Sequence, residues 1–148
     1  MTTNGQTKRS PVEILLVEDN PGDVRLTQEA LKEGKICNNL HIVEDGEEAM
    51  SFLRQEGQYT ESTRPQLILL DLHLPKKDGR EVLAEMRGDP ALSQTEVIIL
   101  TTSESDQDVL QTYNLSADRY ITKPVNLEQF VKVVRSINGF CFAVVPAA

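Results

Sequence analysis

Short runs of apolar residues alternate with longer amphipathic stretches along this chain. Three runs, residues 12–17, 66–70 and 96–100, are rich in Val, Ile and Leu. Runs of this composition are typical of strands that are covered on both faces of a parallel sheet. Two shorter and more polar runs, residues 40–43 and 119–122, predict strands at the edges of the sheet or near a functional rim. The pattern therefore predicts five strands.

The stretches that follow these runs have the periodicity of amphipathic helices. The last of them places Leu127, Phe130, Val131 and Val134 at i, i+3, i+4 and i+7, which is one face of a helix. We expect each apolar stripe to pack into the core. Strand and helix alternate five times, and right-handed crossovers convert this order into a doubly wound α/β sheet.

Length, charge and cysteine content narrow the class of protein. The chain has 148 residues, the size of one domain, and a formal net charge of −8. This charge argues against nucleic acid and anionic membranes as partners, because both would be repelled. Cys37 and Cys141 form no CxxC pair, so no disulfide framework or zinc site is indicated. The first ten residues have no apolar signal region, and no run approaches the roughly 20 residues that span a bilayer, so we expect a cytoplasmic protein.

Polar residues stand directly after four of the five predicted strands. These residues are Glu18 and Asp19 after the first, Asp71 after the third, Thr101 after the fourth and Lys123 after the fifth. Open parallel sheets bind ligands at the C-terminal ends of their strands, near the point where the strand order reverses. We therefore expect three carboxylates, a hydroxyl and an ammonium to meet at one rim.

The carboxylates at this rim indicate a metal site. A single acid after a strand is explained equally well as a helix cap or a turn residue. Asp71, however, follows four apolar residues and precedes Leu72 and Leu74, so its surroundings are poor in water. Carboxylates gathered at low dielectric are costly unless a cation neutralises them. Oxygen ligands without Cys or clustered His favour a hard ion, Mg²⁺ before Ca²⁺.

A carboxylate beside Mg²⁺ is suited to phosphoryl chemistry. Asp71 can attack a phosphoryl group and form an aspartyl phosphate. The metal and the Lys123 ammonium would balance the charge on the phosphoryl oxygens, to which the Thr101 hydroxyl could donate. Lys76 and Lys77 stand in a later loop and are expected to be solvated.

These residues, taken together, resemble the receiver domain of two-component response regulators. The segments that carry the resemblance are Ile14–Asn20, Leu67–Pro75, Asp78-Gly79, Ile99–Thr102 and Tyr120–Pro124. The resemblance implies a flavodoxin-like fold with strand order 2-1-3-4-5, in a receiver domain that covers residues 11–137. A flexible N-terminus at 1–10 and an apolar C-terminal tail at 138–148 would flank that domain.

The resemblance also implies roles for the acidic residues. Asp71 would be the phosphoacceptor, and Glu18 and Asp19 would be the acidic pair. Asp19 and Asp71 would bind Mg²⁺ directly, whereas Glu18 would act largely through water. The backbone carbonyl of His73 would complete the protein ligands, so the imidazole need not bind metal.

A switch is implied by the same resemblance. Lys123 would bind the phosphate, Thr101 would be the switch hydroxyl, and Tyr120 would be its aromatic rotamer partner. The peptide bond between Lys123 and Pro124 would be cis, which is plausible because X–Pro bonds tolerate that isomer. The lifetime of the phosphorylated state does not follow from the sequence, because His73 and Ser103 depart from the family pattern at positions that tune it.

A narrower resemblance concerns the stretches 18–26 and 122–130. Both are similar to small single-domain response regulators that serve cyanobacterial phytochrome-type histidine kinases. This resemblance implies a partner kinase, output through protein contacts, and catalysis limited to the chain's own phosphorylation and dephosphorylation. We also expect a homodimer through the last helix, the last strand and the apolar stretch Phe140–Val145; folding of that stretch onto its own domain is the alternative.

Three other classes compete with this interpretation. A phosphatase of the haloacid dehalogenase type would need an acid where His73 stands, and a dinucleotide-binding enzyme would need GxGxxG after the first strand. A receiver-like binding module that is never phosphorylated is the strongest rival on grounds of fold. Such modules usually lack the acceptor or the acids, and this chain has all of them.

Overall fold

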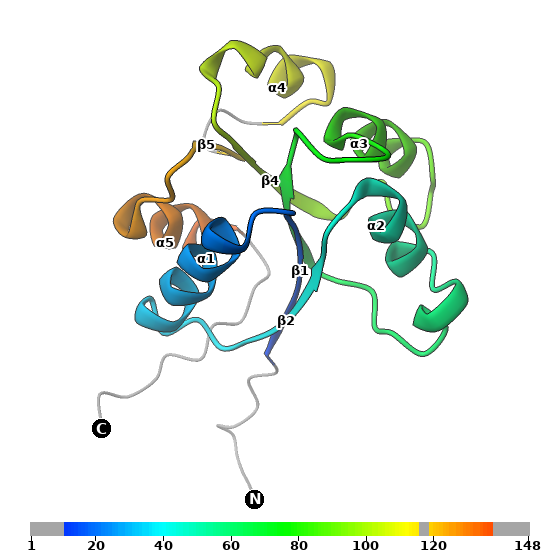
Figure 1. The fold of residues 1–148 in the computed structure, drawn as a ribbon, viewed down its shortest axis with the longest axis horizontal. Helices are drawn as coiled ribbons and strands as arrows, with labels where there is room; N and C mark the ends of the chain where they lie inside the picture. Colours follow the sequence, from blue (N-terminus) through cyan, green and yellow to red (C-terminus); the bar gives the residue numbers. More distant parts are fainter. Residues whose placement is uncertain (1–10, 116–118, 138–148) are drawn as a thin grey trace, which may run out of the picture.

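The computed structural model describes residues 11–115 and 119–137, which form a central sheet between two layers of helices (Figure 1). The predicted segments 1–10 and 138–148 lie outside the described residues. The strands are β1 (Val12–Val17), β2 (Asn38–Val43), β3 (Leu67–Asp71), β4 (Glu96–Thr101) and β5 (Tyr120–Thr122). All neighbouring strands pair in parallel, in the order β2-β1-β3-β4-β5. The predicted fold class and strand order are confirmed, and the two more polar strands lie at the edges.

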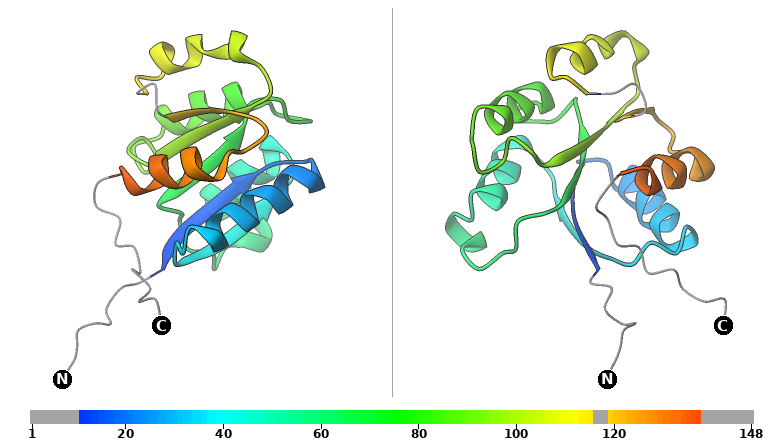
Figure 2. Two further views of the ribbon diagram at one scale, coloured as in Figure 1. Left: turned by 90° about the vertical axis from the view of Figure 1, so that its left-hand side faces the viewer. Right: turned by 180° about the vertical axis from the view of Figure 1, so that it is seen from behind.

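Five α-helices alternate with these strands as predicted. They are α1 (Pro21–Glu33), α2 (Gly46–Leu53), α3 (Gly79–Arg87), α4 (Asp108–Thr112) and α5 (Leu127–Arg135), together with the short 3₁₀ turns η2 (Gly57–Tyr59) and η3 (Glu104–Asp106). Figures 1 and 2 show α1 and α5 on one side of the sheet and α2, α3 and α4 on the other. No helix in the described part of the chain is long and apolar enough to cross a membrane.

The two faces of the sheet are buried in two separate cores, because successive side chains of a strand point to opposite faces. In β1, Leu15 and Val17 pack with α2 and α3, whereas Ile14 and Leu16 pack with α1 and α5. The three central strands divide their apolar residues in the same way. This division explains why those strands have unbroken apolar runs rather than an apolar–polar alternation.

Side-chain caps fix where the main helices begin. Asn20, Asp45, Asp78 and Asn126 each precede a helix and accept a hydrogen bond from a backbone N–H of its first turn. Such caps satisfy donors that the helix itself cannot.

Two glycines allow the segment after β3 to pack closely against its neighbours. A Cβ atom on Gly46, the first residue of α2, would lie 1.8 Å from the carbonyl oxygen of Lys77. A Cβ atom on Gly79, the first residue of α3, would lie 2.5 Å from the carbonyl oxygen of Asp71. Both contacts involve backbone, which cannot move aside as a flexible side chain can. The loop that follows Asp71 is therefore positioned by backbone packing.

Candidate functional site

The register of the parallel sheet brings the predicted rim residues together. Val17 pairs with Leu70, so Glu18 and Asp19, which follow Val17, lie beside Asp71. The next two strand pairs place Thr101 and Lys123 at the same edge of the sheet. Asp71 pairs with Leu100, the residue before Thr101, and Thr101 pairs with Thr122, the residue before Lys123. Each of these residues thus lies at or just past the end of its strand.

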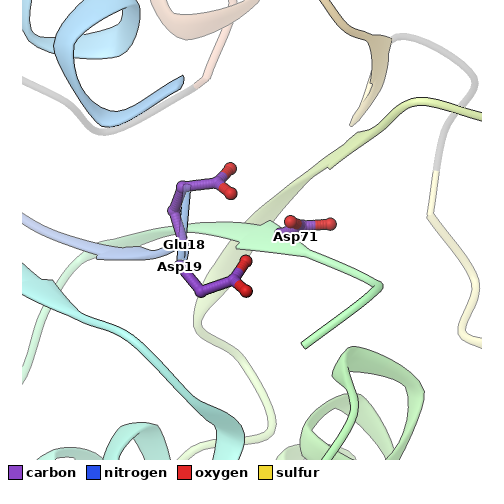
Figure 3. Close-up of side chains that lie close together, drawn as sticks. All are labelled: Glu18, Asp19 and Asp71. Carbon is purple, nitrogen blue, oxygen red and sulfur yellow. The ribbon is translucent and has the colours of Figure 1, made fainter. Parts of the chain in front are cut away.

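Three carboxylates form the acidic cluster, which we define as Glu18, Asp19 and Asp71 (Figure 3). One oxygen atom from each of them lies within 4.8 Å of the other two. Glu18 is 1% exposed and Asp71 is 5% exposed, while Asp19 is open to solvent. The cluster therefore has a buried side and a side that a small ion or ligand can reach.

The ammonium of Lys123 lies against the buried side of this cluster. Its Nζ donates hydrogen bonds to Asp71 Oδ2 at 3.1 Å and to Asp23 Oδ2 at 2.9 Å. It also lies 2.7 Å from Glu18 Oε1, an ion pair whose geometry is not that of a directed hydrogen bond. The Lys123 side chain is only 6% exposed, so these charges interact with little screening by water.

Burial and pairing shift the pKa values of Glu18 and Lys123. The pKa of Glu18 is raised to about 7: desolvation is the main cause, pairing with Lys123 offsets part of the rise, and the negative charge of Asp71 adds to it. Burial by itself lowers the pKa of Lys123, but pairing with Glu18, Asp23 and Asp71 outweighs it, so this pKa is raised. Lys123 therefore remains charged at neutral pH.

The donor set fits a hard divalent cation. Three carboxylates contact the Lys123 ammonium, and a fourth, that of Asp19, lies in the same cluster, so negative charge is in excess. All candidate ligands of the cluster are carboxylate oxygens, and the Asp19 carboxylate is accessible. A divalent ion held by oxygen ligands would correct the imbalance. The cluster predicted from the sequence is thus present as a group that can hold a metal.

Thr101 ends β4, the strand beside Asp71, and Tyr120 begins the neighbouring strand β5. Thr101 is fully buried; its Oγ1 accepts a hydrogen bond from Ser103 N at 3.3 Å, and its carbonyl accepts one from Lys123 N at 2.7 Å. The buried Tyr120 donates its hydroxyl to the carbonyl of Ser103. The predicted cis peptide bond between Lys123 and Pro124 is confirmed. Both residues of the predicted switch therefore contact the loop after β4.

His73 contacts the site through its backbone. Its N–H donates to Asp71 Oδ1 at 3.0 Å, whereas its imidazole Nε2 lies 2.8 Å from Asp106 Oδ2. The imidazole is thus engaged outside the acidic cluster. The metal-ligand role of the His73 carbonyl stays a prediction.

The structure adds residues to the site region that the sequence did not indicate, and it corrects one expectation. Asp23, in the first turn of α1, is a partner of Lys123. Arg80 pairs with Asp106 and Asp108 across the loop after β4. The expectation that Lys77 is solvated is wrong: its side chain is only 26% exposed, and its ammonium pairs with Glu85. Lys76 is exposed as expected.

Comparison with known proteins agrees with this geometry. Residues 14–135 match the family model described as the response regulator receiver domain. The chain is 51% identical over 140 residues to Response regulator Rcp1 of Synechocystis sp. (strain ATCC 27184 / PCC 6803 / Kazusa), which covers 93% of this chain and 95% of that protein.

Two solved structures are similar along almost the whole chain. The Mn²⁺-bound form of Rcp1 has a TM-score of 0.73 at 50% identity, covering 92% of this chain and 98% of that one. The phosphorylated cyanobacterial phytochrome response regulator RcpA has a TM-score of 0.73 at 47% identity, covering 93% of this chain and 98% of that one. The similarity extends over the segments that form the rim of the sheet.

Proposed function

The chain belongs to the response regulator receiver domain family, and we propose that it accepts a phosphoryl group on Asp71 from a histidine kinase in a Mg²⁺-dependent reaction. The observation that carries this proposal is the convergence of Lys123 and two further carboxylates on Asp71. The metal-bound and phosphorylated states named for the two similar structures support the same chemistry.

Different residues of this chain would have different roles in phosphoryl transfer. A carboxylate oxygen of Asp71 attacks phosphorus, and the bond from phosphorus to the imidazole nitrogen of the donor breaks, leaving an aspartyl phosphate. Lys123 is held 3.1 Å from Asp71 Oδ2, where its ammonium can pair with a phosphoryl oxygen. Glu18, Asp19 and Asp71 would hold Mg²⁺, which supplies positive charge to the transferring group. This activity is confined to the chain's own phosphorylation and dephosphorylation.

Phosphorylation would act through the loop after β4. The Thr101 hydroxyl would turn from Ser103 N toward a phosphoryl oxygen, and Tyr120, bonded to the Ser103 carbonyl, would respond to the movement of that loop. A phytochrome-type histidine kinase is the proposed donor, because both Rcp1 and a phytochrome response regulator are near half identical to this chain. Output through a homodimer and other protein contacts, and a cytoplasmic location, remain parts of the proposal.

The test is phosphorylation by acetyl phosphate, followed by intact mass spectrometry. We expect one phosphoryl group on the wild type with Mg²⁺, none in EDTA, and none on Asp71→Asn. Asp89→Asn, at the opposite end of the sheet after α3, is the matched control and should be labelled like the wild type. Labelling of Asp71→Asn at the wild-type level would refute the acceptor role, and an unlabelled wild type would favour the binding module that is never phosphorylated.

The proposed kinase partner and the proposed homodimer need separate measurements. Phosphotransfer from a cyanobacterial phytochrome-type kinase should be faster than transfer from an unrelated histidine kinase. Light scattering should give the mass of a dimer, and deletion of residues 139–148 should reduce it. Equal transfer from both kinases, or an unchanged mass after the deletion, would count against the respective part of the proposal.

A further inference from the structure

Asp23 is a partner of Lys123 that the acidic cluster does not include. An ammonium has three N–H donors, and three carboxylate oxygens lie within 3.1 Å of Lys123 Nζ. Two of these oxygens belong to Glu18 and Asp71, members of the acidic cluster. The third belongs to Asp23, at 2.9 Å. Asp23 and Lys123 are 100 positions apart in the chain, so this contact joins the start of α1 to the segment after β5.

The backbone of Asp23 is fixed at both of its polar groups. Its N–H donates to the side chain of Asn20, the N-cap of α1, at 3.1 Å. Its carbonyl accepts a hydrogen bond from the hydroxyl of Thr27, a fully buried residue of the same helix, at 2.9 Å. The Asp23 carboxylate therefore starts from a rigid helical turn, although its side chain is 25% exposed.

The other two partners of Lys123 change their bonding during the proposed reaction. An oxygen of Asp71 becomes bonded to phosphorus, and the Glu18 carboxylate belongs to the group that would hold the metal. Asp23 takes part in neither event. A lysine side chain has four rotatable bonds, so an ammonium that lost its other partners would have to be ordered again in the transition state.

From this arrangement we propose that Asp23 is a positioning residue that holds the Lys123 ammonium in place while Glu18 and Asp71 engage the metal and the phosphoryl group. The proposal rests on the proposed function of Asp71. It adds a residue of α1 to the site, and it makes the first turn of that helix part of the phosphoryl-transfer geometry. The bond to Asp23 is also one of the contacts that keep Lys123 charged.

Kinetics of phosphorylation by acetyl phosphate at saturating Mg²⁺ test this proposal. For Asp23→Ala we expect the maximal rate to fall about tenfold, since misplacement of a charged group in the transition state is costly. Asp23→Asn keeps an oxygen that accepts a hydrogen bond, so it should recover most of the rate. Glu29→Gln, which removes a carboxylate on the exposed side of α1, is the matched control and should leave the rate unchanged.

Two further readouts separate positioning from a general effect on the site. The Mg²⁺ dissociation constant, measured by calorimetry, should rise by about threefold or less in both Asp23→Ala and Asp23→Asn, because both remove one negative charge near the cluster, and it should not change in Glu29→Gln. The side-chain ¹⁵N signal of Lys123, recorded with Mg²⁺ and beryllofluoride as the phosphoryl mimic, should be sharp in the wild type. Faster exchange of the ammonium hydrogens should broaden it in Asp23→Ala.

Three outcomes would overturn the proposal. They are a maximal rate for Asp23→Ala within twofold of the wild type, a loss of Mg²⁺ affinity in proportion to the loss of rate, and a Lys123 signal that Asp23→Ala leaves sharp. Failure of the proposed function would look different, because the wild type itself would then not be phosphorylated.

Discussion

Lys123 and Arg80 are both cations paired with more than one carboxylate, but their surroundings differ. Lys123 is 6% exposed and lies among Glu18, Asp23 and Asp71 at the end of the sheet. Arg80, at the start of α3, is 36% exposed and pairs with Asp106 and Asp108, of which Asp108 is largely open to water. We call these the buried ion group and the surface ion group.

The difference between the two groups lies in how their excess negative charge is compensated. Water screens the surface ion group, so its pairing can link α3 to the loop after β4 at little cost or gain. The buried ion group lacks that screening, and its excess charge is relieved by a raised pKa of Glu18 or by a cation. Similar residue types therefore hold two segments together in one place and form a group that can hold a metal ion in the other.

Removal of the buried cation should have the largest effect. In Lys123→Met, buried carboxylates lose their partner while the volume of the side chain is nearly kept. We expect the free energy of unfolding to fall by about 3–5 kcal/mol in EDTA, measured by urea denaturation. Added Mg²⁺ should restore part of this loss, because a ligand that binds the folded state stabilises it. Arg80→Met is the matched control; an equal loss in both variants would remove the distinction between the two groups.

Gly46→Ala tests the loop that joins the two groups without removing a charge. The new Cβ atom would lie 1.8 Å from the carbonyl oxygen of Lys77, so backbone must shift. We expect the free energy of unfolding to fall by about 1–3 kcal/mol. In the control Gly88→Ala the new atom would lie 3.5 Å from the nearest heavy atom, so no loss is expected. If Gly46→Ala were as stable as the wild type, backbone packing against Gly46 would not be what positions this loop.

Arg80→Ala should have the smallest effect on stability, below that of Gly46→Ala, because Arg80 is partly solvated and its partner Asp108 is open to water. Its effect should be visible in the pKa of Asp108, which the hydrogen bond from Arg80 lowers. A lowered pKa in the folded state contributes stability above the unfolded-state value of about 3.9, and this contribution is lost as the pH falls through the folded-state pKa. Without Arg80, the pKa of Asp108 should rise toward its ordinary value, and stability should fall less steeply in acid.

Carboxyl ¹³C NMR titration measures the pKa of Asp108 directly. Arg25→Ala, which breaks a pair with Glu29 within α1, is the control and should leave the Asp108 titration unchanged. A pKa for Asp108 that is the same in Arg80→Ala and the wild type would show that Arg80 does not determine it.

The sequence predicted those parts of the molecule that depend on the local pattern of apolar residues and on the parallel arrangement of the strands. Apolar runs located the strands, and the residues after them located the rim, because the strands are parallel and their C-terminal ends share one edge. Strand ends were less exact. β2 begins at Asn38, before its first apolar residue, and β3 and β4 include Asp71 and Thr101, since backbone pairing does not depend on side-chain polarity.

Contacts between distant charged side chains could not be predicted in the same way. The position of Asp23 relative to Lys123 depends on the direction in which α1 leaves the sheet, and an acid in a first helical turn is also explained by the helix dipole. Arg80 pairs with Asp106 and Asp108, which are 26 and 28 positions away in the sequence, and the loops between them have no periodic pattern from which the contact could be predicted. An excess of acids over the single rim ammonium was visible in the sequence, but it did not identify which further acid would reach that ammonium.

The hydrogen bonds of the tyrosine hydroxyls have a practical consequence for following conformational change in this protein. The chain has three tyrosines and no tryptophan, so its near-ultraviolet absorbance and emission come mainly from tyrosine. Each tyrosine hydroxyl donates a hydrogen bond. Tyr120 donates to the carbonyl of Ser103, Tyr113 donates to the carbonyl of Arg80, and Tyr59 donates to the carboxylate of Glu48. Tyr120 thus contacts the segment between β4 and α4, and Tyr113 links the end of α4 to α3, so a difference spectrum can follow a rearrangement of this region in the unlabelled protein.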